Sequence, residues 1–483
     1  MEKEIMSLPL IVGGEEVSSD RMMKLEYDDL IINFPVMDDE IKKKIIDMDQ
    51  DAIHDLSLSD IVAFLQKVSY LWLDEEYSLR KMLMEYGPRI SGQSPEMYKH
   101  NLAVVLQFIS FKSFMEDVVD LELGDKRLLD EWLSKENAEI HAEPLGRLLH
   151  IISGNVALVG FYSVIRGILT KNVNIVKLSQ KDLLATYLFI KSFADVDPEH
   201  PVTKSVSAVY WNKDDSENIE YFSSKADGMI VWGGHDTIKA YKSICPVGCE
   251  FIEYGPKKGI QIIDIANVQD RNLELKVAHD ISVFDQEACL SPQLIFVKKG
   301  ANMKRFNIML LKGLDSYNRL WPAAKHSVDH YIHMNYHLKC QEFLGNLAWT
   351  PDNREWMIVH LENPADIKLE HPLGRTIFIK EVDSFDECLD YIDGTVQTVG
   401  IAPKSLAREL RGKLTRRGVT RIANIGSVEM PREGLTHEGI DMRKLVRIVG
   451  MDKENEYHAT TYDVPDGYFD QFIYSLHWAE KGE

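Results

Sequence analysis

The sequence predicts an α/β protein with two regions, each built on a mostly parallel sheet. Between residues 147 and 255, short apolar runs alternate with segments of helical periodicity, and the same alternation resumes after residue 259. Strands separated by helices of this length are typical of βαβ units. With 483 residues and 45% apolar composition, the chain is long enough for two or three domains.

The first 125 residues read as helical pieces and short strands, most clearly helical at 59–73 and 94–119. Residues 126–146 are charged and are expected to form a connector or a projecting hairpin. The first α/β region follows this segment. Its strands are expected at 147–153, 173–179, 205–211, 228–234 and 250–255.

The second α/β region has the same alternation, and a mixed tail, 441–483, follows it. Its strands are expected at 259–265, 293–297, 356–361, 375–382, 396–402 and 420–425.

Composition excludes several classes of partner and location. The formal net charge of −21 argues against nucleic acid and anionic membrane. The stretch 148–169 is long enough to span a membrane, but Gly154 and Asn155 interrupt it and Arg166 lies within it. A buried strand, a turn and a buried helix are therefore predicted there. Five cysteines and no signal peptide indicate a reducing, cytoplasmic location.

Two features of the first region could bind a nucleotide. In VWGGHDTI (231–238), Gly233 and Gly234 join a strand to a helix and would let backbone N–H groups approach a phosphate. A plain strand-to-helix turn is the alternative, since no G-x-G-x-x-G is present. Lys177 ends another strand, at the edge of the sheet where nucleotides bind, although it could be an ordinary surface lysine.

The stretch VFDQEACLSPQ (283–293) holds one cysteine, Cys289, which is either a nucleophile or a small buried apolar side chain. A thioester-forming cysteine needs a base and donors for the oxyanion. Glu253, near the end of a strand, is a candidate base. The Asn155 side chain and the Cys289 backbone N–H are candidate donors.

Four segments resemble the aldehyde dehydrogenase superfamily in order and spacing. HAEPLGRLLHIISGNV (141–156) resembles the opening that ends in P-W-N, and VNIVKLSQ (173–180) resembles V-x-K-P-S-E. VWGGHDTI resembles F-T-G-S-T, and IEYGPKKG (252–259) resembles L-E-L-G-G-K. Within the superfamily, SGN, EYGPKKG and ACLSPQ resemble the acyl-CoA reductases of bacterial bioluminescence.

This resemblance implies a Rossmann-type cofactor domain, a catalytic α/β domain and an oligomerisation arm. The cofactor domain would comprise 1–125 and 147–255, and the catalytic domain 256–440. The arm and tail would comprise 126–146 and 441–483.

The resemblance also implies roles for single residues. Cys289 would accept the acyl group, Asn155 and the Cys289 N–H would form the oxyanion hole, and Glu253 would be the general base. The implied cofactor-binding residues are Lys177, Ser179, Gln180, Gly233 and Gly234. The superfamily often has Glu where this chain has Gln180. A neutral side chain there removes repulsion of a 2′-phosphate and favours NADPH.

The implied activity is NADPH-dependent reduction of a long-chain acyl-CoA or acyl-protein thioester to the fatty aldehyde used by luciferase. The implied partners are an acyl-protein synthetase, an acyl transferase and further copies of the chain in a tetramer. Three alternatives stay open: an aldehyde dehydrogenase that forms acid, a cofactor-independent cysteine acyltransferase or thioesterase, and a catalytically silent scaffold.

No metal site is expected from the sequence. His326, His330, His333 and His337 share one helical face and could bind zinc, but no Glu or Cys completes a recognisable ligand set. Cys245 and Cys249 are not spaced as C-x-x-C.

Overall fold

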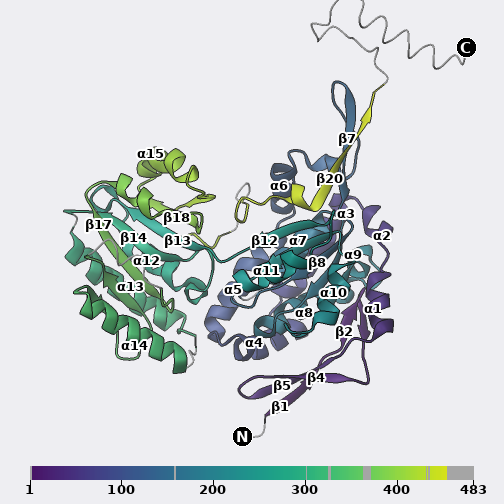
Figure 1. Cartoon of the computed structure of the whole chain (residues 1–483), viewed down its shortest axis with the longest axis horizontal. Helices are drawn as coiled ribbons and strands as arrows, with labels where there is room; N and C mark the ends of the chain where they lie inside the picture. The colour runs from purple at the N-terminus through teal and green to yellow at the C-terminus, as the bar shows by residue number, and fades with distance from the viewer. Residues whose placement is uncertain are drawn as a thin grey trace, which may run out of the picture.

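The computed structural model describes residues 3–156, 159–300, 302–324, 328–362, 371–430, 432 and 436–453 (Figure 1). Its two large sheets confirm the predicted α/β class.

The first region forms a seven-stranded sheet in the order β12-β11-β8-β9-β10-β2-β3. Five of these strands are parallel, and each lies within a stretch predicted as a strand. Their apolar runs are almost continuous because helices cover both faces of a parallel sheet. These strands are β8 (Arg147–Ile151), β9 (Val173–Lys177), β10 (Val206–Val209), β11 (Gly228–Trp232) and β12 (Glu250–Tyr254).

The N-terminal segment completes this sheet and covers it with helices. β2 (Leu10–Val12) and β3 (Glu15–Val17) extend its edge with antiparallel pairing. β1 (Glu4–Ser7), β4 (Met22–Glu26) and β5 (Leu30–Pro35) form a separate small sheet. The N-terminal helices are α1 (Asp39–Ile46), α2 (Asp51–His54), α3 (Leu58–Leu73), α4 (Ser78–Ser91), α5 (Pro95–Ser110) and α6 (Lys112–Leu123).

One helical prediction needs correction. The segment 94–119 forms two helices, because Phe111 between α5 and α6 has extended backbone angles, φ −119° and ψ 115°. The apolar stretch 148–169 forms β8, a loop and the buried helix α7 (Val159–Leu169), as predicted. Among the described residues, no helix is long and apolar enough to cross a membrane. The other helices of this region are α8 (Leu183–Val196), α9 (Pro201–Lys204), α10 (Ser216–Ser223) and α11 (His235–Ile244).

The second region forms a seven-stranded sheet in the order β15-β16-β17-β14-β13-β18-β19. Successive side chains along its strands enter two separate cores, one on each face of the sheet. Leu294 belongs to the same core as Leu338 and Leu410, whereas Ile295 belongs to the core on the other face. The strands are β13 (Lys258–Ile263), β14 (Pro292–Lys298), β15 (Leu347–Trp349), β16 (Met357–His360), β17 (Thr376–Val382), β18 (Val396–Ala402) and β19 (Arg421–Ala423). The helices are α12 (Leu273–Ser282), α13 (Met303–Leu320), α14 (Val328–Phe343) and α15 (Lys404–Thr415).

A third, three-stranded sheet joins the charged segment to the start of the tail. β7 (Ala138–Pro144) pairs antiparallel with β20 (Val446–Asp452) and with β6 (Leu133–Ser134). Figure 1 shows β7 and β20 projecting away from both α/β regions. We call this sheet the arm. Residues 454–483 of the predicted tail lie outside the described residues.

Candidate active site

A cavity of about 840 Å³ opens at the carboxyl ends of the first sheet. Ile151, Lys177, Trp232 and Tyr254 are the last residues of β8, β9, β11 and β12, and all four line it. The chain runs from β8 outward to β9 and β10, and then returns to place β11 on the other side of β8. The cavity therefore lies where ligands bind in open α/β sheets, at the point where the strand order reverses.

The loop before β14 contributes the opposite wall, including Cys289. Three residues of this loop, Phe284, Asp285 and Gln286, have φ between 51° and 65°, a left-handed conformation that non-glycine residues seldom adopt. Buried contacts hold them there. The Arg375 guanidinium donates to Asp285 at 2.6 Å, and the Gln286 side chain accepts from the Thr376 backbone N–H at 2.9 Å. Strain of this kind persists only where neighbouring structure imposes it.

The Cys289 sulfur contacts the imidazole of His437. The Sγ and Nε2 atoms lie 3.4 Å apart. Burial, with a smaller contribution from Glu438, raises the pKa of the Cys289 thiol to about 12. Burial and the nearby Arg166 and Arg421 lower the pKa of His437 to about 3. At neutral pH, the pair is therefore a thiol beside an uncharged imidazole.

Aromatic side chains fix the position of His437. Its ring centroid lies 5.2 Å from that of Trp232 and 5.3 Å from that of Tyr254, both at the ends of strands. Glu438 follows it, with a carboxylate oxygen 3.8 Å from His437 Nε2. Burial raises the pKa of Glu438 to about 7.

The structure brings Asn155 to the cysteine loop. The Asn155 side-chain amide donates to the backbone carbonyl of Glu287 at 3.0 Å, two residues before Cys289. The Cys289 backbone N–H contacts its own sulfur and lowers the pKa of the thiol slightly, against the effect of burial. Asn155 thus contacts the loop that carries Cys289, and both residues line the cavity.

Glu253 has a different setting. Its carboxylate accepts from Lys242 Nζ at 2.9 Å, its side chain is about half exposed, and it is not among the residues that line the cavity. Because successive side chains of a strand point to opposite faces, Tyr254 enters the cavity and Glu253 does not. The group in contact with the thiol is His437.

Four of the five predicted cofactor-binding residues line the cavity: Lys177, Ser179, Gly233 and Gly234. Gly234 is the N-cap of α11, and a Cβ added there would meet nothing within 4 Å. The helix N-terminus is therefore open to the cavity, as binding of a pyrophosphate requires. Burial lowers the pKa of Lys177 to about 8. Gln180 does not line the cavity, and its backbone carbonyl accepts from the Tyr27 hydroxyl at 2.7 Å.

Comparison with known proteins identifies the family. The model of the acyl-CoA reductase (LuxC) family matches residues 53–449, which include the five parallel strands of the first sheet, the whole second sheet, and Cys289 with His437. The chain belongs to the acyl-CoA reductase (LuxC) family. A long-chain acyl-protein thioester reductase of Photorhabdus luminescens is 33% identical over 462 residues, covering 94% of each chain. One from Vibrio harveyi is 31% identical over 470 residues, covering 96% of each.

The fold of this family member is that of the aldehyde dehydrogenases. An aldehyde dehydrogenase from Brucella melitensis superposes with a TM-score of 0.71 at 12% identity, over 92% of this chain and 96% of the other. At 12% sequence identity, this similarity shows a shared fold and nothing more specific.

Two groups of residues that the sequence singled out lie outside the cavity of this reductase-family chain. His330, His333 and His337 lie on α14, where His333 and His337 pair through their Nε2 atoms at 3.0 Å; His326 lies outside the described residues. Cys245 and Cys249 are free thiols. His437 was not predicted. It is 148 residues from Cys289 in the chain, and no spacing rule connects the two.

Proposed function

We propose that the protein reduces a long-chain fatty acyl thioester, acyl-CoA or acyl-protein, to the fatty aldehyde with NADPH, through an acyl group carried on Cys289. One observation carries the proposal: a single cavity is lined by the Cys289 thiol and by the glycines that open the N-terminus of α11. A nucleophile and a phosphate-binding helix end that share one cavity suit transfer between an acyl group and a dinucleotide.

In the acylation step, the Cys289 sulfur attacks the thioester carbonyl carbon. His437 Nε2 takes the thiol proton and returns it to the departing thiolate, so the substrate leaves as a free thiol and the acyl group stays on sulfur. The thiol needs such a base, because burial leaves almost no free thiolate at neutral pH. Asn155 and the Cys289 N–H stabilise the oxyanion.

A hydrocarbon chain fits the side of the cavity formed by α5, α6 and α7. Cavity volumes of about 300–1,000 Å³ are usual for ligand sites, and this one is within that range. Apolar side chains from three helices form its wall: Val104, Val105 and Phe108 of α5, Val118 of α6, and Tyr162 and Ile165 of α7. Burying a long chain here would favour fatty acyl over short acyl groups.

A nicotinamide dinucleotide fits the other side. NADPH, when bound, supplies the hydride that releases the acyl group as aldehyde. The N–H groups at the start of α11 would hold its pyrophosphate, and Lys177 and Ser179 would bind its adenosine ribose. The preference for NADPH would rest on Lys177, which lines the cavity, whereas Gln180 does not.

The position of Glu253 supports aldehyde rather than acid as the product. A base aimed at the acyl group would activate water and give the fatty acid, as in the alternative of an ordinary aldehyde dehydrogenase. The Glu253 carboxylate is engaged with Lys242 instead. Its role as general base, which the sequence predicts, competes with that of His437.

The protein would act together with partner enzymes and with further copies of itself. The acyl group would come from an ATP-dependent acyl-protein synthetase and an acyl transferase, with the aldehyde going to a luciferase. Copies of the chain would assemble as a tetramer through the arm. A reducing cytoplasm would keep Cys289 as a thiol.

Steady-state product analysis tests the proposal. The purified chain is given tetradecanoyl-CoA with NADPH, with NADH, or with no nicotinamide. We expect tetradecanal and oxidised NADPH in equal amounts, and neither with Cys289→Ala. Free acid formed at the same rate without a nicotinamide would instead indicate a thioesterase, and no turnover would indicate a scaffold.

A further inference from the structure

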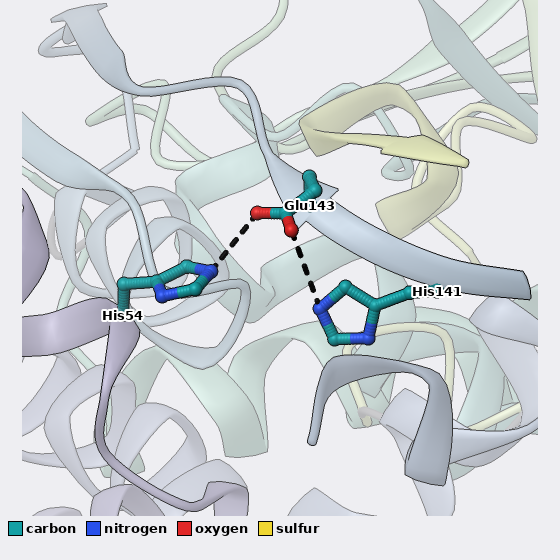
Figure 2. Close-up of side chains that lie close together, drawn as sticks. All are labelled: His54, His141 and Glu143. Atoms are coloured by element: carbon teal, nitrogen blue, oxygen red, sulfur yellow. Dashed lines mark hydrogen bonds and ion pairs between the residues drawn. The ribbon is translucent and has the colours of Figure 1, made fainter. Parts of the chain in front are cut away.

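Three side chains that the reaction does not use converge at the base of the arm (Figure 2). His54 is the last residue of α2, and His141 and Glu143 lie on β7. We propose that His54, His141 and Glu143 bind one divalent transition-metal ion of the Zn²⁺ type. The ion would join the N-terminal helices to the arm.

The distances suit a single ion. His54 Nε2 lies 2.9 Å from Glu143 Oε2, and His141 Nε2 lies 3.7 Å from Glu143 Oε1. All three ligand atoms lie within 4.8 Å of one another. Zinc binds imidazole nitrogen and carboxylate oxygen at about 2.0–2.2 Å, so ligand atoms in a tetrahedral site are about 3.4 Å apart. Small side-chain movements bring the three to that spacing.

The backbone explains why the three side chains meet. His141 and Glu143 are two residues apart on a strand, so they point to the same face. Helix α2 ends against that face and presents His54, as the close-up shows.

The backbone hydrogen bond of His141 directs its other ring nitrogen toward Glu143. His141 Nδ1 lies 3.1 Å from the backbone carbonyl of Glu131. A carbonyl only accepts, so Nδ1 must carry the proton. In the neutral ring, Nε2 then carries a lone pair that points toward the Glu143 carboxylate. A metal ion placed between these two atoms would bind both of them. A backbone partner on the far nitrogen is also what orients histidines that bind metals.

The neighbouring charges leave room for an ion. The Lys171 ammonium contacts the His54 carbonyl at 3.2 Å, but it is paired with Asp130 at 2.8 Å. Arg447 lies opposite Glu143 in the strand register, and its guanidinium contacts the Pro144 carbonyl at 3.5 Å.

The ligand set selects the type of metal. Two imidazoles and one carboxylate suit Zn²⁺ and its neighbours, whereas Mg²⁺ prefers oxygen ligands. The side chains of His54 and Glu143 are 38% and 33% exposed, which provides an entry path and a fourth position for water. His141 is buried and holds the set in place.

Metal titration of the full chain tests the proposal. Bound metal is first removed from the protein with a chelator. Zn²⁺ binding, and the absorption spectrum of the protein with Co²⁺ in place of Zn²⁺, are then measured for wild type, His54→Gln and Glu143→Gln. We expect one equivalent in wild type and affinity at least about tenfold weaker in each variant. Zn²⁺ should raise the unfolding temperature of wild type only, and Mg²⁺ should not compete. The two substituted side chains are partly exposed, so unfolding without metal should be unchanged.

Two controls separate this site from two other groups that could bind zinc. His333→Gln breaks the histidine pair on α14, and Cys289→Ala removes the cavity thiol from the group it forms with His437 and Glu438. Both control variants should still bind one equivalent of Zn²⁺. The proposal is wrong if wild type binds no Zn²⁺ saturably, or if a control loses the ion while His54→Gln and Glu143→Gln keep it.

Discussion

At the scale of single residues, the reactivity of the site depends on a thiol and an imidazole that are both uncharged. Burial raises the pKa of Cys289 to about 12 and lowers that of His437 to about 3. A proton can therefore pass from sulfur to nitrogen only as the sulfur attacks, which is general base catalysis within the contact of 3.4 Å.

This account predicts the effects of two substitutions. His437→Gln should slow acylation of Cys289 by about 10²- to 10⁴-fold, the usual contribution of a general base. Glu253→Gln should change it much less, because Glu253 is engaged with Lys242. Rapid-quench measurement of acyl-enzyme formation distinguishes the two. Equal losses, or a larger loss in Glu253→Gln, would favour the base that the superfamily pattern implies.

A pH dependence follows from Glu438, whose pKa burial raises to about 7. As the pH rises through 7, its carboxylate ionises, and the new negative charge makes loss of the thiol proton harder. His437, with a pKa of about 3, stays neutral over this range. The acylation rate of Glu438→Gln relative to wild type should therefore increase across pH 7. A ratio independent of pH would show that Glu438 does not titrate beside the thiol.

At the scale of elements, the loop before β14 depends on one buried ion pair. Arg375 and Asp285 are each about 1% exposed, and they hold the left-handed residues that precede Cys289. Arg375→Met should lower the free energy of unfolding by about 3–5 kcal/mol, because it leaves a buried carboxylate without its partner. Urea unfolding measures this. Lys299→Met, which removes an exposed ion pair with Asp383, should leave the urea midpoint nearly unchanged.

The N-terminus of α11 gives a second prediction at this scale. Gly234→Val should weaken NADPH binding by tenfold or more, because its side chain would project into the space proposed for the pyrophosphate. Stability should be retained, since φ at Gly234 is −70° and a Cβ there meets no neighbour within 4 Å. Fluorescence titration of NADPH measures the affinity. Gly394→Val, also without neighbours within 4 Å, is the matched control, and equal affinity in both variants would contradict the assignment.

The alternating strands and helices could be predicted from the sequence because the periodicity of apolar residues is a local property. Every strand expected between 147 and 425 is present, since continuous apolar runs mark strands buried on both faces. The break at Phe111 was missed because both helices around it have the same apolar spacing. His437 was missed because its contact with Cys289 depends on how distant segments pack. The left-handed residues 284–286 were missed because they contain no glycine and are imposed by Arg375 and Thr376.

At the scale of the whole molecule, residues from distant parts of the chain form the cavity. The first sheet provides the glycines, the second region provides Cys289, and the segment leading into the arm provides His437. The arm itself ends in β20, where Ile448 and Met451 are half exposed. An edge strand with exposed apolar side chains is suited to pairing with another copy, in agreement with the proposed assembly.

The most direct test of the central claim is the intact mass of the full chain after incubation with tetradecanoyl-CoA, before and after NADPH is added. The account predicts one tetradecanoyl adduct that maps to Cys289, is absent in Cys289→Ala, and leaves as tetradecanal when NADPH is added. An adduct on another residue, or one that leaves only as tetradecanoic acid whether or not NADPH is present, would contradict it.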